Sequence, residues 1–158
     1  MPFFTGEHET TIGAKRRLPI ASSLREEVMV GEGRDFYLVL GPDRRLWLYP
    51  DEYYRTLAST MKRSVVPSVK SRGSLGLLTA MARLLKPDAQ GRVVLPEKSL
   101  QRAGMADMKE VTLVGEGDHI VLWNSDDWEQ HVETSLVEYA GALDAAAAAM
   151  DAANSTTS

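Results

Sequence analysis

The sequence predicts a mostly β protein of the α+β class, assembled from two pseudo-equivalent halves with short peripheral helices. The first observation is an internal repeat: Arg17 and Arg92 lie 75 residues apart, and the same features follow each in the same order. "RLPIA" corresponds to "RVVLP", "FYLVLG" to "VTLVGEG", and "LWLYPDEYY" to "IVLWNSDDW". The second observation is the alternation of short apolar runs with turn residues, which is typical of strands and hairpins. A repeat of this size places two copies of one supersecondary unit in a single chain.

These runs predict eight strands, four in each half. In the first half we expect them at about 8–12, 17–21, 36–40 and 46–49, and in the second half at about 82–87, 92–95, 111–115 and 119–123. "GPDR" in the first half and "GEGDH" in the second supply turn residues between two apolar runs. The last two strands of each half should therefore form a hairpin.

Short helices should connect and close the strands of each half. Ser23 with Glu26 has the pattern of a capping box, which should open a short helix before Val28. Pro50 and Ser125 should start the helices that close the two halves, because aromatic and aliphatic residues then recur at helical spacing.

Composition divides the chain into four segments. A polar connector marked by Pro and Gly, "SVVPSVKSRGSLG", separates the halves, and an alanine-rich run with little apolar surface follows the second half. We expect residues 136–151 to be helical and 152–158 to be disordered. The predicted boundaries are 4–63 for the first half, 64–81 for the connector, 82–135 for the second half, and 136–158 for the helical extension and tail.

Charge and composition narrow the classes of function. With a net charge of −4 and an isoelectric point near 5.4, the chain is not expected to bind nucleic acid through bulk charge. Any such contact must be local, or repeated over several copies. The absence of cysteine rules out disulfides and thiolate zinc sites. No apolar run reaches the roughly 18 residues of a membrane span, and "MPFFTGEHET" lacks the features of a signal peptide. We therefore expect a cytoplasmic protein without a membrane partner.

No catalytic or metal-binding constellation is recognisable in the sequence. His8 is flanked by Glu7 and Glu9, but strand alternation would send both carboxylates to the face opposite the imidazole. "GEGD" is not followed by the helix start and Lys-Ser/Thr that a phosphate-binding loop requires. We predict no enzymatic activity, no cofactor, no metal and no small-molecule ligand.

The turn that opens the second half is predicted to be structural. Asp88 is a turn-forming residue, and Gly91 supplies the left-handed conformation that closes such a hairpin. Asp88 and Arg92 are four residues apart across the turn and should form an ion pair. These three residues are therefore expected to hold the fold.

The corresponding turn of the first half has a different composition. Gly13 stands where the second half has the aspartate, and Arg16 stands where it has the glycine. Lys15, Arg16 and Arg17 therefore form a run of cations without a carboxylate in the same turn. Such a turn is either a solvated hairpin tip or a contact for phosphate or guanine, which arginine binds in bidentate fashion.

Taken together and in order, the motifs of the chain resemble the MraZ family. The motifs are "FTGEHETTIGAKRRLPI", "LWLYPDEYY", "DAQGRVVLP", "VTLVGEGDHIVLW" and "DDW", and they cover roughly residues 4 to 132. The pattern D-x-x-G-R, followed by an apolar pair and proline, is the signature of the AbrB-type swapped-hairpin repeat. The resemblance implies a pseudo-symmetric, double-repeat swapped-hairpin β-barrel of eight strands, in subunits that assemble into rings.

The resemblance also implies a function and its site. Family members are bacterial transcriptional repressors of their own cell-division and cell-wall gene cluster, and the basic first-half turns of a ring meet successive direct repeats in promoter DNA. Lys15 and Arg17 fall on the basic residues of the family, and Arg16 adds a third cation. Several turns engaged in series raise avidity by roughly 10²- to 10⁴-fold. The implied partners are double-stranded DNA and further copies of the chain, in a nucleoid-associated location. Arg44 and Arg45, in "GPDRRL", are weaker candidates for DNA contact.

Three positions depart from the pattern of the family. Gly13, Arg16 and Ala21 stand in place of aspartate, glycine and proline. A left-handed backbone is costly for a residue with a side chain, so we expect a reshaped turn in which Gly13 takes over the permissive role. An alternative function stays open. The chain would then be an oligomeric scaffold or interaction protein that has lost specific DNA binding and works through acidic helices such as "DDWEQHVE".

Overall fold

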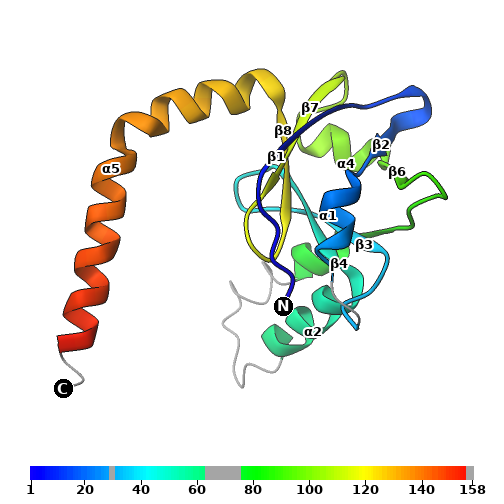
Figure 1. Cartoon of the computed structure of the whole chain (residues 1–158). Coiled ribbons are helices and arrows are strands. Elements are labelled where there is room, and N and C mark those ends of the chain that lie inside the picture. Colours follow the sequence, from blue (N-terminus) through cyan, green and yellow to red (C-terminus); the bar gives the residue numbers. More distant parts are fainter. Residues whose placement is uncertain (29–30, 63–75, 156–158) are drawn as a thin grey trace. The chain divides into compact units, whose positions relative to one another are not determined.

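The structure, a computed structural model, describes residues 1–28, 31–62 and 76–155. Most of the expected connector at 64–81 lies outside these residues. The chain divides into two compact units, residues 1–124 and residues 125–158, which are described separately (Figure 1).

The first unit contains a six-stranded sheet and a two-stranded sheet, and every strand pair is antiparallel. In spatial order the six strands are β1 (Glu7–Thr11), β7 (Glu110–Gly115), β8 (Ile120–Asn124), β4 (Leu46–Pro50), β3 (Phe36–Leu40) and β5 (Arg83–Leu85). The smaller sheet pairs β2 (Arg17–Pro19) with β6 (Arg92–Val94). All eight predicted strands are present, with boundaries that differ by at most two residues, and the α+β class is confirmed. Among the described residues, strand pairing does not join the two sheets into a closed barrel.

Short helices follow the strands. They are η1, a single 3₁₀ turn (Ala14–Arg16), α1 (Ser22–Glu26), α2 (Asp51–Lys62) and α4 (Glu97–Arg102). Residues 76–80, before β5, are also helical. α2 begins directly after Pro50, as predicted. The capping box predicted at Ser23 is wrong, because α1 already begins at Ser22 and its N-cap, Ala21, makes no side-chain capping bond. Ala21 occupies the place that Pro96 takes before α4, so the serines lie inside the helix.

Exchanging the two halves leaves the strand pairing unchanged. The larger sheet has the order β1-β7-β8-β4-β3-β5, and replacing each strand by its counterpart in the other half gives the same order in reverse. At the centre of this sheet β4 pairs with its own counterpart, β8. In the smaller sheet Arg17 lies opposite Val94, and Pro19 lies opposite Arg92. The repeat in the sequence is therefore also a symmetry of the pairing, with Arg17 and Arg92 at equivalent positions.

Both halves contribute equivalent positions to one hydrophobic core. Each of these side chains is at most 3% exposed: Leu18 with Val93, Ile20 with Leu95, Leu24 with Leu100, and Leu38 with Leu113. Full burial of a side chain of this size stabilises a fold by about 1.5–3 kcal/mol. Because Leu18 and Val93 lie at the centre of the β2–β6 pair, the turns that precede these strands are anchored on a rigid frame.

The second unit consists of one long helix, α5 (Ser125–Ser155). It begins at Ser125 as predicted, with Asp126 and Asp127 in the first turn, where the helix dipole favours acidic residues. The prediction of disorder after residue 151 is wrong for residues 152–155, which are helical, because the high helix propensity of alanine continues to that point. Residues 156–158 lie outside the described residues.

Candidate nucleic-acid interface

The turn before β6 is closed by its own side chains. The N–H of Asp88 donates to Arg92 O, and the N–H of Gly91 donates to Asp88 O, both at 2.9 Å. Gly91 has a φ of 78°, the left-handed conformation expected of it. Asp88 Oδ1 accepts from the backbone N–H groups of Gln90 and Arg92, and Oδ2 accepts from Arg92 Nε, each at 2.9 Å. The expected Asp88–Arg92 ion pair is present, and these bonds, with the one from the Arg92 backbone foremost, lower the pKa of Asp88.

The turn before β2 keeps the outer hydrogen bond of the other turn but has a different interior. The N–H of Gly13 donates to Arg17 O at 2.8 Å. Inside the turn the N–H of Arg17 donates to Ala14 O, and Lys15 and Arg16 both have a φ of 58°. Two central residues with positive φ are the mark of a type I′ turn, which usually carries Asn-Gly. A left-handed residue with a side chain costs roughly 1–2 kcal/mol, so this cationic tip is also a strained one.

Gly13 does not relieve this strain, and the prediction that it would do so is wrong. Its φ of −83° and ψ of −171° are extended values that any residue adopts. Arg16, the counterpart of Gly91, keeps the left-handed conformation because the outer hydrogen bond fixes the length of the turn. The change of shape lies at Lys15, whose counterpart Gln90 does not have a positive φ.

A guanidinium group lies at an equivalent carbonyl beside both turns, but it comes from different elements. Arg16 Nε donates to Leu95 O at 2.9 Å and so ties the first turn to the second half. At the equivalent carbonyl, Ile20 O accepts from Arg25 Nε of α1 at 3.0 Å. A Cβ atom on Gly91 would lie 2.5 Å from Arg25 Cζ, so the glycine leaves the space that Arg25 fills. Arg16 therefore holds the tip in place as well as adding charge to it.

Lys15 and Arg17 differ from Arg92 in their electrostatic partners. Lys15 is exposed and Arg17 is half-buried. Within the part of the chain that the structure describes, neither side chain has a carboxylate at ion-pair distance, whereas Arg92 is paired with Asp88. Arg17, Pro19 and Arg92 line the same pocket. In Figure 1 the two turns are the blue and green loops at the right, beside β2 and β6. Arg92, whose charge is neutralised by Asp88, and Arg17, whose charge is not neutralised within the described residues, therefore line one pocket.

Charge is divided unevenly between the two units. Residues 1–124 hold all 18 lysines and arginines but only 15 of the 22 aspartates and glutamates, which gives a formal charge of +3. Residues 125–158 hold the other 7 acidic residues and no lysine or arginine. The unit that carries both turns is therefore basic, and the acidic balance of the chain comes from α5 and the residues after it.

The second basic tip, between β3 and β4, is engaged in the fold. Arg44 has a φ of 61°, and its Nη2 donates to Arg102 O at 3.4 Å. The guanidinium of Arg45 lies 3.5 Å from the centre of the Trp123 ring, and Arg45 Nη1 lies 3.6 Å from Asp43 Oδ2. The attraction between a cation and a ring holds Arg45 against the sheet. These partners make the second tip a weaker candidate for polyanion contact than the first.

Sequence reasoning missed a cluster at the equivalent tip between β7 and β8. The ring of His119 stacks on Trp47 with 4.0 Å between ring centres. Its Nδ1 lies 2.8 Å from Asp118 Oδ1, and its Nε2 lies 3.2 Å from Glu116 Oε2. His119 is the counterpart of Arg45, since each lies directly before the last strand of its half. Each also stacks on a tryptophan in the last strand of the other half, Arg45 on Trp123 and His119 on Trp47. This equivalence in the repeat could have pointed to His119 from the sequence.

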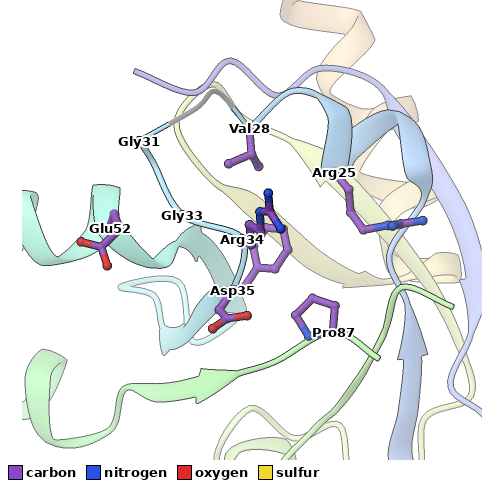
Figure 2. Close-up of a pocket in the computed structure, with 9 residues that line it drawn as sticks. Arg25, Val28, Gly31, Gly33, Arg34, Asp35, Glu52 and Pro87 are labelled. Atoms are coloured by element: carbon purple, nitrogen blue, oxygen red, sulfur yellow. The ribbon is translucent and has the colours of Figure 1, made fainter. Parts of the chain in front are cut away.

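A cavity of about 670 Å³ lies beside α1 (Figure 2). Its lining contains both basic residues, Arg25 and Arg34, and acidic residues, Asp35 and Glu52. Arg25 is held by its bond to Ile20 O, and in Figure 2 its guanidinium extends away from the other labelled side chains. The cavity therefore offers no converging set of like groups for a charged ligand.

In residues 1–28, 31–62 and 76–155 no three His, Cys, Asp or Glu side chains are grouped so that they could hold a metal ion. In the same ranges no helix is both long and apolar enough to cross a membrane.

Comparison with known proteins points to one family. A family model described as "MraZ protein, putative antitoxin-like" matches residues 78–151. The chain is 34% identical over 140 residues to a protein named transcriptional regulator MraZ from Herpetosiphon aurantiacus, a match that covers 89% of this chain and 93% of the relative. Proteins of the same name from Clostridium tetani and Bifidobacterium longum are each 27% identical, over 133 and 143 residues, and the matches cover 84% and 90% of this chain and 89% and 91% of the relatives.

Proposed function

The chain belongs to the MraZ family, and from this premise we propose that it is a DNA-binding transcriptional regulator whose first-half turn contacts promoter DNA. The name shared by its relatives supports the regulatory role. The observation that carries the choice of surface is the contrast between two equivalent turns. Among the residues that the structure describes, one turn presents Lys15 and Arg17 without a carboxylate partner, and in the other Asp88 neutralises Arg92. A polyanion gains most from the turn whose cations are not already compensated.

The three cations of the first turn have separate roles in this proposal. Lys15, at the exposed tip, contacts a phosphate. Arg17, fixed at the start of β2, contacts a phosphate or the O6 and N7 atoms of a guanine. Arg16 holds the tip against Leu95 O and adds charge next to the contact. Arg44 and Arg45 contribute at most a secondary contact, because both have partners within the fold.

One turn is too small a contact to bind DNA tightly by itself. Each phosphate contact changes the slope of log K against log salt by about 0.9, so a turn with three cations gives weak and strongly salt-dependent binding. A homo-oligomeric ring would place several turns on one face and make every contact after the first intramolecular. We therefore propose a ring whose turns meet successive direct repeats, and the +3 charge of residues 1–124 favours its approach to DNA.

The remaining parts of the proposal follow from the family. The chain would act in the cytoplasm, at the nucleoid, as a repressor of a cell-division and cell-wall gene cluster that includes its own gene. The exchange symmetry of the strand pairing supports a swapped-hairpin arrangement of the two halves. We propose no enzymatic activity.

The experiment is a fluorescence-anisotropy titration of the full chain against DNA from upstream of its own gene and against a shuffled duplex of the same composition. We expect tighter binding to the upstream DNA, and a loss of affinity on the order of tenfold or more between 50 and 200 mM salt. Equal, weak affinity for both duplexes from an oligomeric chain would instead identify the protein as a scaffold that has lost specific DNA binding.

A further inference from the structure

The helix α5 presents an apolar seam that DNA contact does not use. Leu136, Tyr139, Leu143, Ala146 and Met150 recur at intervals of three and four residues, which is the 3.5-residue period of helices that pair along a seam. Leu136, Tyr139, Leu143 and Met150 are between 53% and 67% exposed, and α5 buries none of its side chains. In proteins most of the stability of a helix comes from packing of its apolar face and not from helix propensity alone. The seam therefore calls for a partner surface.

Between Leu136 and Met150 the acidic residues of α5 lie away from this seam, and Glu129 and Glu133, at positions a and e, precede it. With Leu136 at position a of the heptad, Glu138, Asp144 and Asp151 fall at positions b or c, on the outer side of the helix. The positions that flank the seam are uncharged and small: Ser135, Ala140, Ala142, Ala147 and Ala149. From Leu136 to Met150 a basic partner helix would find no carboxylate beside the seam to pair with. A second copy of the same seam would meet no like charge there, and the small flanking residues would let two helices approach closely.

We propose that α5 is a self-association surface, in which the seams of two copies of the chain pack against each other. From Leu136 to Met150 the seam is about 20 Å long on a helix about 10 Å across, which amounts to a few hundred Å² per copy. A standard interface buries about 800 Å² per partner, so two isolated helices would pair weakly. Copies that are already held in one assembly meet at an effective concentration in the millimolar range, where such a seam suffices. The inference thus rests on the homo-oligomer of the proposed function and not on its DNA contact.

The absence of cysteine from the chain makes the test direct, because one introduced thiol reports on one position. Leu143→Cys places a thiol at the centre of the seam. It meets its own counterpart whether the two helices run parallel in register or antiparallel with full overlap. Val137→Cys is the matched control, since Val137, at position b of the heptad, lies outside the seam and is 86% exposed. In the purified full chain under mild oxidation, we expect disulfide-linked dimers of Leu143→Cys at a yield roughly fivefold or more above that of Val137→Cys, because a disulfide needs Cα atoms within about 7 Å.

Light scattering on the same samples separates this inference from the proposed oligomer. An oligomer in which both cysteines cross-link equally, or in which Leu143→Cys does not cross-link, overturns the seam and leaves the oligomer in place. A monomer without cross-links overturns both.

A second pair of variants tests the seam without a disulfide. Leu143→Glu and Val137→Glu add the same charge to α5, the first within the seam and the second outside it. We expect the helical circular-dichroism signal to fall in Leu143→Glu and to stay at the wild-type level in Val137→Glu. Equal signals from the two variants would count against the seam.

Discussion

The turns that open the two halves share one frame and differ in what closes them. Each has the same outer hydrogen bond, and each leads into one strand of the β2–β6 pair. In the second turn a carboxylate, Asp88, accepts three hydrogen bonds, and Gly91 takes the left-handed conformation without cost. In the first turn no carboxylate is present, and Lys15 and Arg16 take left-handed conformations that are costly for them. The comparison indicates a division of labour in which one copy stabilises the fold and the other presents charge.

Strain and charge occur together in the first turn, and this is the pattern expected of a functional site. Residues in sparsely populated backbone conformations persist only where the surrounding structure holds them. Here the surrounding structure consists of the outer bond from Gly13 to Arg17 and the bond from Arg16 to Leu95 O. The second turn, whose residues suit their conformations, shows what the first turn would look like if stability alone had shaped it.

DNA affinity should respond most strongly, and differently, when one arginine is removed at each of the two equivalent positions. Arg17→Ala should weaken binding to the upstream DNA by about 5- to 150-fold for each turn engaged, which corresponds to 1–3 kcal/mol per lost contact. Arg92→Ala removes the same charge from the equivalent position and should leave affinity within about twofold of wild type, because Arg92 is already paired with Asp88. Anisotropy titrations of both variants provide the measurement. Equal losses would mean that only net charge matters.

Giving the first turn the residues that its backbone prefers should separate stability from binding. Lys15→Asn combined with Arg16→Gly produces the Asn-Gly pair typical of a type I′ turn. Relief of two left-handed side chains, at roughly 1–2 kcal/mol each, exceeds the loss of the Arg16–Leu95 hydrogen bond, at about 1 kcal/mol. The free energy of unfolding should therefore rise by about 1–3 kcal/mol, while DNA affinity falls. Denaturant unfolding and anisotropy are the two measurements, and a destabilised variant would show that the tip is not strained.

Asp88→Ala should have the reverse effect in the second turn. It removes the acceptor for the N–H groups of Gln90 and Arg92 and the partner of the Arg92 guanidinium. We expect the melting temperature to fall by a few degrees, while DNA affinity per folded molecule is retained. A thermal melt beside an anisotropy titration tests this. An Asp88→Ala protein that melts like wild type but binds DNA poorly would reverse the roles assigned to the two turns.

A smaller effect is expected on the stability of the fold at low pH, where the second turn contributes through Asp88 and the first turn, which has no carboxylate, does not. The folded-state pKa of Asp88 is lowered, so its contribution to stability is present above its unfolded pKa and is lost as the pH falls through the folded value. The loss should therefore begin below about pH 4. Asp88→Asn should flatten this part of a series of melts from pH 5 to pH 2. If the melting temperature of Asp88→Asn fell with pH as steeply as that of the wild type, other carboxylates would account for the loss of stability in acid.

The strands could be predicted from sequence because both their signals are local. Alternating apolar residues and the turn residues of "GPDR" and "GEGDH" mark them, and the repeat predicts which strands are equivalent. The start of α1 could not be predicted in this way. It is set by where β2 leaves its pairing with β6, which makes Ala21 rather than Ser23 the residue before the helix.

The sequence could predict the residues of the candidate site that are adjacent in the chain, but not the contacts that they make with distant residues. Lys15, Arg16 and Arg17 form a visible run, but Arg16 bonds to a carbonyl 79 residues away in the sequence. The place of Arg25 over Gly91 is equally non-local. The repeat does hold a weak indication of these two contacts. The turn of the first half has Arg16, and the helix of the second half has Gln101. The turn of the second half has Gly91, and the helix of the first half has Arg25, so each pairing of a turn with the helix of the other half supplies one arginine.

Whether the first turn or the second lies on DNA can be tested without removing any proposed contact. Ala14 and Ala89 occupy equivalent positions in the two turns, both are exposed, and the chain has no cysteine. Ala14→Cys and Ala89→Cys, each labelled with a thiol-reactive photo-cross-linker and mixed with the upstream duplex, report the distance of each turn from DNA. We expect covalent protein–DNA product from Ala14→Cys and little or none from Ala89→Cys. Equal yields, or product from Ala89→Cys alone, would contradict it.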